Sequence, residues 1–372
     1  MKKLNQLSLL EVKKFLRKKG FKLLYKKDNK FSLLNDFKNF YYTAVSSLII
    51  ISFFFFLPII GAIKKNSYEV NNNSKLNLEK VLSGGSIESK KDETIDTVKV
   101  FQDVFEFEDI PSDTVRLSAN VIEEIFKDTN YNIKDVRKNK FVKPVSLSLL
   151  PNEMKKIESS QKRKNLFIQI ILPLILAESN QIKADRKKLF SILNRSNNSK
   201  AESKWLKKKF KQYGVKNNDL PVLKIRMDEI PTSLAIAQAA KESGWGTSRF
   251  ALEGNALFGQ WTYSDNGIKP LNTNGDEKHK VMKFKILKAS IRAYYRNLNT
   301  HSSYKIFRKI RAESRDNEEK LDSLILVNYL DKYAATGKEY VKVLKQIINQ
   351  NSLKDFDDVK LLPTSSRLKN LI

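Results

Sequence analysis

An uncharged apolar stretch, Thr43–Ile63, places the strongest constraint on how this chain of 372 residues can fold. Its 21 residues, TAVSSLIIISFFFFLPIIGAI, are enough for a helix to cross a hydrocarbon layer of about 30 Å. Tyr41 and Tyr42 lie at one end and two lysines at the other, as is typical of interfacial anchors. The stretch predicts a transmembrane helix, and a buried helix of a soluble protein is the alternative.

The charge around this stretch predicts its orientation. The 42 residues before it carry twelve Lys and Arg, whereas the sixty after it, 64–123, carry eight. By the positive-inside rule, the tail 1–42 stays in the cytoplasm and the chain beyond Ile63 is exported. A cleaved signal peptide is disfavoured, because the charged region is too long and no convincing A-x-A site follows. We expect a single-pass signal anchor, with the tail either disordered or forming a basic amphipathic helix on the membrane.

The exported part begins with a polar linker. Residues 64–116 are rich in Asn, Ser, Lys, Asp and Glu, which predicts a solvated tether. Residues 117–215 have a helical and basic pattern, and Ser118–Asp128 and Asn152–Ser160 are typical of amphipathic helices. Phe167–Ala177 is apolar almost all round but only eleven residues long with a proline inside. We therefore expect a kinked core helix there and no second membrane span.

A net charge of +28 suits an anionic partner, which can be nucleic acid, an acidic membrane surface or a cell-wall polymer. The pattern of Lys187–Lys211 predicts a basic helix that contains Trp205. We interpret its charged side chains first as a solvated face, and the alternative is contact with acidic wall peptides or lipid headgroups. No base-reading motif is present, and export argues against nucleic acid. The sequence predicts no metal site and no cofactor: it has no cysteine, no Walker loop, no GxGxxG after a strand, and two histidines at non-ligand spacing.

The stretch Pro231–Tyr263 holds the candidate chemistry. Pro231 with Thr232 suits a helix start, the following Leu-Ala-Ile-Ala-Gln-Ala-Ala run favours helix, and Gly244 ends it. Glu242 then lies in the last turn, where the negative end of the helix dipole tends to raise a carboxyl pKa. A solvated helix-end glutamate is the alternative. Glu178 has the same two interpretations, as an active-site acid or a helix-end residue.

Glycines and aromatic residues crowd the stretch after Glu242. The glycines allow tight turns, and the aromatic rings offer flat apolar surfaces, so a carboxyl group beside them is a plausible general acid for a sugar polymer. Packing in a core is the alternative for the rings. The predicted sugar-binding residues are Trp245, Phe258, Gln260, Trp261, Tyr263 and His279.

Three segments of this sequence resemble one family. Ala239–Phe250, continuing through Glu253–Trp261, resembles the signature of bacterial β-N-acetylglucosaminidases of glycoside hydrolase family 73, in their Bax-like branch. Asn297–His301 and the residues that follow resemble a later helix of that branch, and Tyr333–Val341 resembles its terminal tyrosine motif. The resemblance runs from about Val142 to Phe356.

The resemblance implies a mainly α, lysozyme-like helical domain with a small β-lobe, which hydrolyses the β-1,4 bond after N-acetylglucosamine in peptidoglycan. It also implies the inner membrane of a Gram-negative cell, with the catalytic domain in the periplasm. Tyr333 is placed near the acid, where its hydroxyl orients the acetamido group or a water, and a buried tyrosine with a satisfied hydroxyl is the alternative. Tyr340 we assign to packing.

The second catalytic group stays open. Asp276 and Glu277 are candidates in the turn-rich segment Ser264–Lys280, and the acetamido group of the substrate can replace a carboxylate. His279 is followed by Lys280, where the Bax-like pattern usually has an acidic residue, and this departure weakens the case for a carboxylate at that point. We expect His279 itself to be structural or substrate-facing and not catalytic.

The remaining pattern is helical over Lys288–Leu298, Glu319–Leu330 and Glu339–Asn349. We expect a catalytic core over 216–356 and a mobile tail over 357–372, and no feature predicts an oligomeric state. Two rival functions remain: a lytic transglycosylase or muramidase on the same scaffold, and a non-catalytic wall-binding protein.

Overall fold

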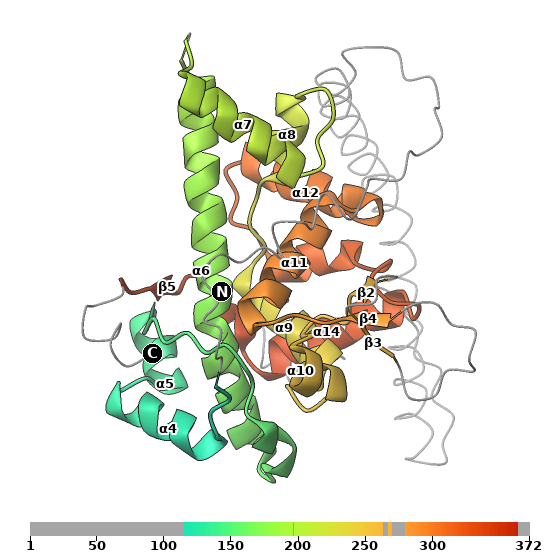
Figure 1. Ribbon diagram of the computed structural model, residues 1–372. Coiled ribbons are helices and arrows are strands. Elements are labelled where there is room, and N and C mark those ends of the chain that lie inside the picture. Colours follow the sequence, from blue (N-terminus) through green and yellow to red (C-terminus); the bar gives the residue numbers. More distant parts are fainter. Residues whose placement is uncertain (1–114, 196, 263–266, 270–279, 364–372) are drawn as a thin grey trace, which may run out of the picture. The chain divides into compact units, whose positions relative to one another are not determined.

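The computed structural model describes residues 115–195, 197–262, 267–269 and 280–363 (Figure 1). The predicted membrane helix Thr43–Ile63, the basic tail and the linker up to residue 114 lie outside these residues. Four of the predicted site residues also lie outside them, namely Tyr263, Asp276, Glu277 and His279.

The described part is mainly helical with two small sheets, as the sequence predicts. Its α-helices are α4 (Ala119–Asp128), α5 (Ile133–Asn139), α6 (Ser160–Leu193), α7 (Lys200–Gln212), α8 (Leu220–Arg226), α9 (Thr232–Ser243), α10 (Arg249–Gly254), α11 (Leu287–Thr300), α12 (Lys305–Asp316), α13 (Ser323–Leu326) and α14 (Lys338–Gln350). Its 3-10 turns are η1 (Asn152–Lys156), η2 (Ser302–Tyr304), η3 (Val327–Tyr329) and η4 (Leu353–Phe356). Its strands are β1 (Phe141–Val142), β2 (Trp261–Thr262), β3 (Gly267–Ile268), β4 (Lys280–Met282) and β5 (Lys360–Leu361).

Helix α6, of 34 residues, is the longest element of the described part (Figure 1). By length and composition alone it can cross a membrane, but 72% of its most apolar window is buried inside the protein. It packs against α9 and α11, so the predicted core helix is confirmed. The predicted length of eleven residues was wrong, because the turns on both sides are rich in helix-forming Lys, Arg, Gln, Ala and Leu and continue the helix.

A proline inside α6 is accommodated by a contact with the segment between α4 and α5. Pro173 has no N–H, so the Gln169 carbonyl one turn earlier loses its helical hydrogen-bond donor. The Tyr131 hydroxyl donates to this carbonyl at 3.0 Å, and the Gln169 side chain donates to the Tyr131 carbonyl at 2.7 Å. This pair of hydrogen bonds supports the helix at the point where the proline would weaken it.

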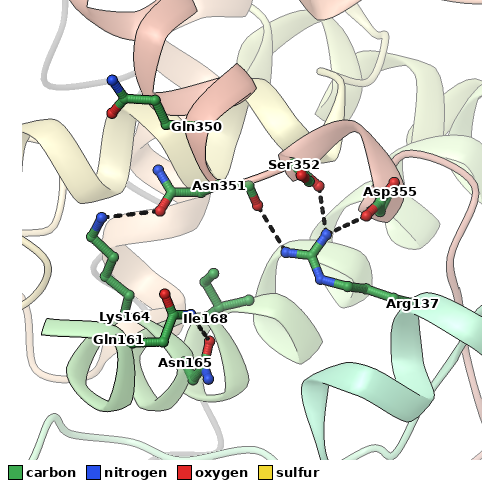
Figure 2. A pocket seen from close by; sticks show the side chains of 9 residues that line it. All are labelled: Arg137, Gln161, Lys164, Asn165, Ile168, Gln350, Asn351, Ser352 and Asp355. Atoms are coloured by element: carbon green, nitrogen blue, oxygen red, sulfur yellow. Dashed lines mark hydrogen bonds and ion pairs between the residues drawn. The ribbon is translucent and has the colours of Figure 1, made fainter. Parts of the chain in front are cut away.

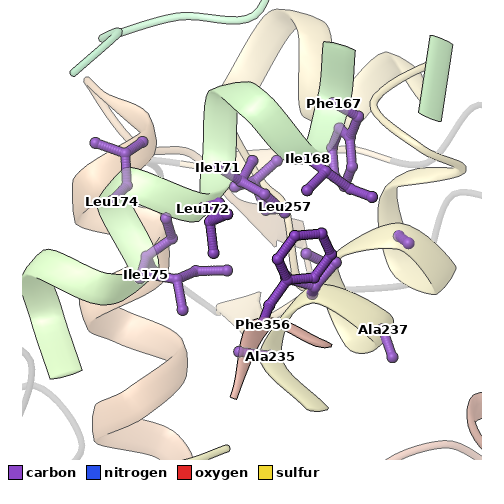
Figure 3. Packing of buried hydrophobic residues seen from close by; sticks show 14 of the residues in the cluster. Phe167, Ile168, Ile171, Leu172, Leu174, Ile175, Ala235, Ala237, Leu257 and Phe356 are labelled. Atoms are coloured by element: carbon purple, nitrogen blue, oxygen red, sulfur yellow. The ribbon is translucent and has the colours of Figure 1, made fainter. Parts of the chain in front are cut away.

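Helix α9 is the centre of the core, because it is buried on every face from Thr232 to Ala240. It packs against α6, α14 and η4. Figure 3 shows the Phe356 ring of η4 between the apolar side chains of α6 and Ala235 of α9. The start of α9 is fixed by Asp357, whose carboxylate accepts from the Ser233 N–H and hydroxyl, both at 2.8 Å.

Strand β5 joins the end of the described chain to its beginning. It pairs in parallel with β1, with Phe141 opposite Lys360 and Val142 opposite Leu361. The Arg137 guanidinium reinforces this connection by donating to the Asn351 and Ser352 carbonyls at 2.8 and 2.6 Å. The expected mobile tail after Phe356 was therefore wrong as far as β5, because main-chain pairing with β1 holds it.

The basic segment Lys187–Lys211 is not one helix. It contains the end of α6 and most of α7, and α7 starts with a capping box in which Ser199 and Glu202 bond each other's backbone N–H. The ends of these helices and α8 enclose a separate small core, formed by Leu189, Phe210, Tyr213, Val215, Leu223 and Met227.

The β-lobe is a three-stranded antiparallel sheet in the order β2-β4-β3. It follows α10 and precedes α11, where the sequence predicts it.

Two predicted helices were too long: only η1 forms within Asn152–Ser160 before α6 starts at Ser160, and Glu319–Leu330 contains the short α13 and η3. In the second case the Asp322 carboxylate accepts from the Leu324 N–H at 2.7 Å and starts the helix later.

Candidate active site

The last turn of α9 carries the predicted acid. Gly244 takes the left-handed conformation, with φ 58°, that commonly ends a helix. The Ser243 hydroxyl donates to the Ala239 carbonyl at 2.6 Å and accepts from the Gly246 N–H at 2.9 Å. Glu242 therefore lies at a helix end whose backbone is fixed, and its predicted position is confirmed.

Burial dominates the electrostatics of Glu242. Removal from water raises the pKa of its carboxyl group, while a hydrogen bond from Tyr340 and the charge of Lys241 lower it, and the balance is upward. The Oε1 atom is buried and has no hydrogen-bond partner among the described residues. A half-buried carboxyl group with a raised pKa and a free oxygen is suited to hold a proton and to give it to a bound substrate.

The loop after α10 lies directly against this carboxyl group. Gly259 has φ +61°, and a Cβ added there would lie 3.3 Å from Glu242 Oε2. The position requires glycine for two reasons, since a side chain would strain the backbone and crowd the carboxylate. The glycine therefore sets the close approach of this loop to the acid.

Three tyrosines line the region around Glu242. Tyr333 stacks on Tyr340 with ring centroids 5.5 Å apart and an angle of 4°, and Tyr304 lies 5.9 Å from Tyr333. Burial raises the pKa of Tyr304 to about 12, and the Glu242 carboxylate also raises it. The Tyr333 hydroxyl donates to the Phe258 carbonyl at 3.0 Å. Tyr333 thus lies near the acid, and its hydroxyl proton is already used.

Tyr340 is the residue that the sequence analysis assigned to packing alone. Its ring is buried, but its hydroxyl also accepts a hydrogen bond from the Gln238 side-chain amide at 3.1 Å. The Gln238 carbonyl oxygen in turn accepts from the Tyr294 hydroxyl at 2.8 Å. The assignment was therefore incomplete. The signal in the sequence was Gln238 itself, a polar residue in an apolar run one turn before Glu242.

The predicted sugar surfaces differ in accessibility. Trp261 on β2 is 54% exposed, and its stacking on a sugar stays a prediction. Trp245 packs edge-on against Phe167 of α6 at 5.9 Å, and the Lys164 Nζ lies 5.0 Å from the centre of its ring. Trp245 therefore contributes to the packing of α9 on α6, and its contact with sugar stays a prediction.

Phe258 was wrongly predicted to bind sugar through its ring. The ring is buried and stacks on Tyr294, with centroids 4.0 Å apart and an angle of 9°. Gln260, two residues later, has both side-chain amide atoms buried with no hydrogen-bond partner among the described residues. Buried amide atoms without partners are uncommon, so Gln260 remains a candidate for binding substrate.

Comparison with known proteins decides the family. A family model described as glucosaminidase, mannosyl-glycoprotein endo-beta-N-acetylglucosaminidase, matches residues 224–353, which include Glu242 and Tyr333. Protein bax of Escherichia coli (strain K12) is 36% identical over 211 residues, covering 55% of this chain and 75% of that protein. The chain belongs to the Bax-like glucosaminidase family. It is a glycoside hydrolase of the endo-β-N-acetylglucosaminidase type, and no solved structure matches it.

The other predicted acidic residues of this glucosaminidase do not share the surroundings of Glu242 in the described part of the chain. Glu178 lies inside α6 and not at a helix end, and its carboxylate pairs with Arg292 Nε of α11 at 3.3 Å. Asp276 and Glu277 lie outside the described residues, so their role as a second catalytic group stays a prediction. In the described ranges, no three His, Asp or Glu side chains gather in a way that could hold a metal ion.

A polar pocket of about 300 Å³ lies at the far end of α14 (Figure 2). Arg137 on one side of it donates to the Asn351 and Ser352 carbonyls and to the Asp355 carboxylate. Lys164 donates to the Asn351 side chain at 3.1 Å. None of the predicted site residues lines this pocket.

Proposed function

We propose that this glucosaminidase is a membrane-anchored peptidoglycan hydrolase that cleaves the β-1,4 bond after N-acetylglucosamine, with Glu242 as its general acid. One observation carries the proposal. A carboxyl group with a raised pKa and an unpartnered oxygen lies against the glycine-aromatic loop inside the region that matches the family.

The reaction starts with the protonated Glu242 carboxyl group. It donates its proton to the glycosidic oxygen while the bond from that oxygen to the sugar C1 breaks. Positive charge develops on the sugar ring, and a water molecule then adds to C1 and loses a proton to a base. Trp261 supplies an exposed ring on which a sugar of the glycan chain stacks.

The group that accepts the proton from water has two candidates. One is a carboxylate, Asp276 or Glu277, in the segment between β3 and β4. The other is the Glu242 carboxylate itself, if the acetamido oxygen of the substrate first attacks C1 and water then opens the resulting oxazoline ring, which makes a second carboxylate unnecessary. Tyr333, next to the acid, suits the orientation of either nucleophile through its oxygen atom.

The proposed location is the inner membrane, with a single pass through Thr43–Ile63. The N-terminus stays in the cytoplasm, because the positive charge is concentrated before the apolar stretch. As a solvated tether, the predicted linker after the anchor would give the catalytic region the reach to act on a polymer above the membrane.

Product analysis tests the reaction. The purified full-length protein, its Glu242→Gln variant and its Glu253→Gln variant are each incubated with peptidoglycan, and the released fragments are weighed by mass spectrometry. Glu253 is a suitable control because it lies in the same motif but its side chain is 59% exposed. We expect fragments with reducible N-acetylglucosamine ends from the wild type and the control, and a rate lowered about 10²–10⁴-fold in Glu242→Gln.

Other products would point to the alternatives. Fragments with reducible or anhydro-muramic ends would show a muramidase or a lytic transglycosylase on this scaffold. A wild type that releases no fragments but binds peptidoglycan would show a wall-binding protein.

A further inference from the structure

We propose that the polar pocket at the far end of α14 is a subsite for the peptide branches of peptidoglycan, and that the Lys164 ammonium group binds a peptide carboxylate there (Figure 2). This subsite rests on the proposed function for the identity of the polymer. It adds to that function a place for the part of the polymer that is not sugar, and none of the motifs in the sequence gives the pocket a role.

The lining of the pocket carries one positive charge that no carboxylate of the described residues neutralises. Of its two cations, Arg137 is paired with the Asp355 carboxylate, which is the one acidic group among the lining residues. The other, Lys164, donates through Nζ to the neutral Asn351 side chain at 3.1 Å and lies 5.0 Å from the centre of the Trp245 ring. An ammonium group has three hydrogens to donate. The pocket therefore offers an anionic group a charge-assisted hydrogen bond.

The types of side chain in the lining favour a peptide over a sugar. None of the described residues that line the pocket is aromatic, so a sugar ring finds no flat apolar surface there. The lining instead contains the side-chain amides of Gln161, Asn165, Gln350 and Asn351. Amides both donate and accept hydrogen bonds, as the backbone of a peptide does. A short peptide with a free carboxylate therefore matches both the amides and the charge of Lys164.

Helix α14 shows that the pocket lies within reach of a branch from the cleaved glycan chain. In its first turn the Tyr340 hydroxyl accepts from Gln238, which lies one turn before Glu242 on α9. Its last residue, Gln350, lines the pocket. Tyr340 and Gln350 are ten positions apart, which is about 15 Å along a helix axis. An extended peptide covers about 3.5 Å per residue, so a branch of about four residues spans this distance.

Trp245 gives an independent measure of how close the pocket lies to the acid. It follows Glu242 by three residues, and three residues of chain span at most about 11 Å. Its half-buried ring is the one that lies against the Lys164 ammonium group. The end of α9 and the cation of the pocket are therefore neighbours, and a peptide branch that passes this ring meets Lys164.

Binding of free peptide branches tests the subsite without catalysis. The branches are released from peptidoglycan by an amidase, labelled with a fluorophore at their amino groups, and titrated with the purified full-length protein while the anisotropy is measured. The same peptides with their carboxylates converted to amides serve as the second probe. We expect the amidated peptides to bind at least about tenfold more weakly than the carboxylate form, because the charge-assisted hydrogen bond to Lys164 is lost.

Two variants and a matched control place this contact in the pocket. Lys164→Gln removes the charge, and Gln350→Glu, at an exposed position, adds a carboxylate that competes for Lys164. We expect each to weaken binding of the carboxylate peptides about tenfold. Lys162→Gln is the control, because it removes the same charge from the same helix outside the lining, where Lys162 pairs with Glu123 at 3.0 Å. We expect its binding to stay within about twofold of the wild type.

Cleavage of glycan chains shows whether the subsite serves the reaction. KM is measured on soluble chains that carry their peptides and on chains from which an amidase has removed them. We expect the ratio of the first KM to the second to rise about tenfold in Lys164→Gln and Gln350→Glu and to stay at the wild-type value in Lys162→Gln. An equal rise of KM on both kinds of chain would mean that Lys164 acts through Trp245, and the peptide subsite would be wrong.

The outcomes separate the subsite from the proposed function. If the wild type binds both forms of the peptide equally, or binds neither, the pocket is not a peptide subsite, whatever the protein cleaves. If Lys164→Gln does not fold, the binding and the KM ratio of Gln350→Glu decide. If the carboxylate peptides bind in the expected way but the wild type cleaves no chain, the proposed hydrolase is wrong and the subsite belongs to a wall-binding protein.

Discussion

A single glycine controls the distance between a loop and the acid. Gly259 combines a positive φ with a virtual Cβ only 3.3 Å from Glu242 Oε2. We expect Gly259→Ala to cost about 1–2 kcal/mol of stability through backbone strain and to lower kcat at least about tenfold, because the added methyl displaces the carboxyl group. Thermal unfolding and the glycan assay measure the two effects.

Gly337→Ala is the matched variant for this prediction. Gly337 also has a positive φ, with φ 53° and ψ −115°, so a side chain there strains the backbone, but the nearest atom to an added Cβ is 3.9 Å away and the crowding is absent. A similar loss of kcat in both variants would mean that strain, and not contact with Glu242, explains the effect.

The sequence predicts the position of a residue well when its surroundings are formed by neighbours in the chain. Glu242 at a helix end follows from its neighbours in the chain, and its position was predicted correctly. Phe258 and Tyr340 were not, because the ring of Phe258 is covered by Tyr294 and the hydroxyl of Tyr340 meets Gln238. These partners are distant in the sequence, and periodicity carries no information about which distant side chains meet.

Among the elements, α6 shows how a helix can include a proline. The Tyr131 hydroxyl replaces the hydrogen bond that Pro173 cannot make to the Gln169 carbonyl. We expect Tyr131→Phe to cost about 1–3 kcal/mol, because a carbonyl in the helix is left without a donor. In a Pro173→Ala background, where an N–H is restored, the same substitution should cost clearly less.

A double-mutant cycle measured by denaturant unfolding tests this compensation. The coupling between Tyr131 and Pro173 should exceed about 0.5 kcal/mol, the level expected for residues that share one hydrogen-bonding group. Strictly additive free energies of unfolding would mean that Tyr131 and the proline are independent.

Long helices with a clear period were predicted well, and short ones were not. Ser118–Asp128, Lys288–Leu298 and Glu339–Asn349 correspond to α4, α11 and α14 within a few residues. Asn152–Ser160 failed because Ser159 caps the start of α6 and interrupts the pattern, leaving a 3-10 turn with Met154 buried. A hydrophobic period of three to four residues is present in both kinds of segment, so the cap residues decide where a helix stops.

For the described part as a whole, the contacts cross the predicted boundary between 117–215 and 216–356. Arg137, which precedes this boundary in the sequence, binds three groups that follow it, namely the Asn351 and Ser352 carbonyls and the Asp355 carboxylate. Its guanidinium carbon also lies 4.5 Å from the centre of the Phe356 ring. We expect one calorimetric unfolding transition for the region, shifted down by several degrees in Arg137→Ala without a change in the number of transitions.

Lys138→Ala is the control, because Lys138 is an exposed basic neighbour on the same helix. Two separate transitions in the wild type, with only one of them sensitive to Arg137→Ala, would mean that the two segments are independent domains. The anchor and linker could not be assessed in the same way, since they lie outside the described residues.

The pairing of β1 with β5 has a consequence for the order in which the chain folds on the proposed export route. Arg137 and Ser352, which meet next to these strands, are 215 positions apart in the sequence. On the proposed export route, β1 leaves the membrane first. β5 follows only after nearly the whole chain has crossed, so the two strands cannot pair before that point. Tyr340, Phe356 and Asp357 arrive in that same late segment, and they complete the surroundings of Glu242 and fix the start of α9. On the proposed export route, a chain stalled during translocation would therefore lack the segment that completes the surroundings of Glu242.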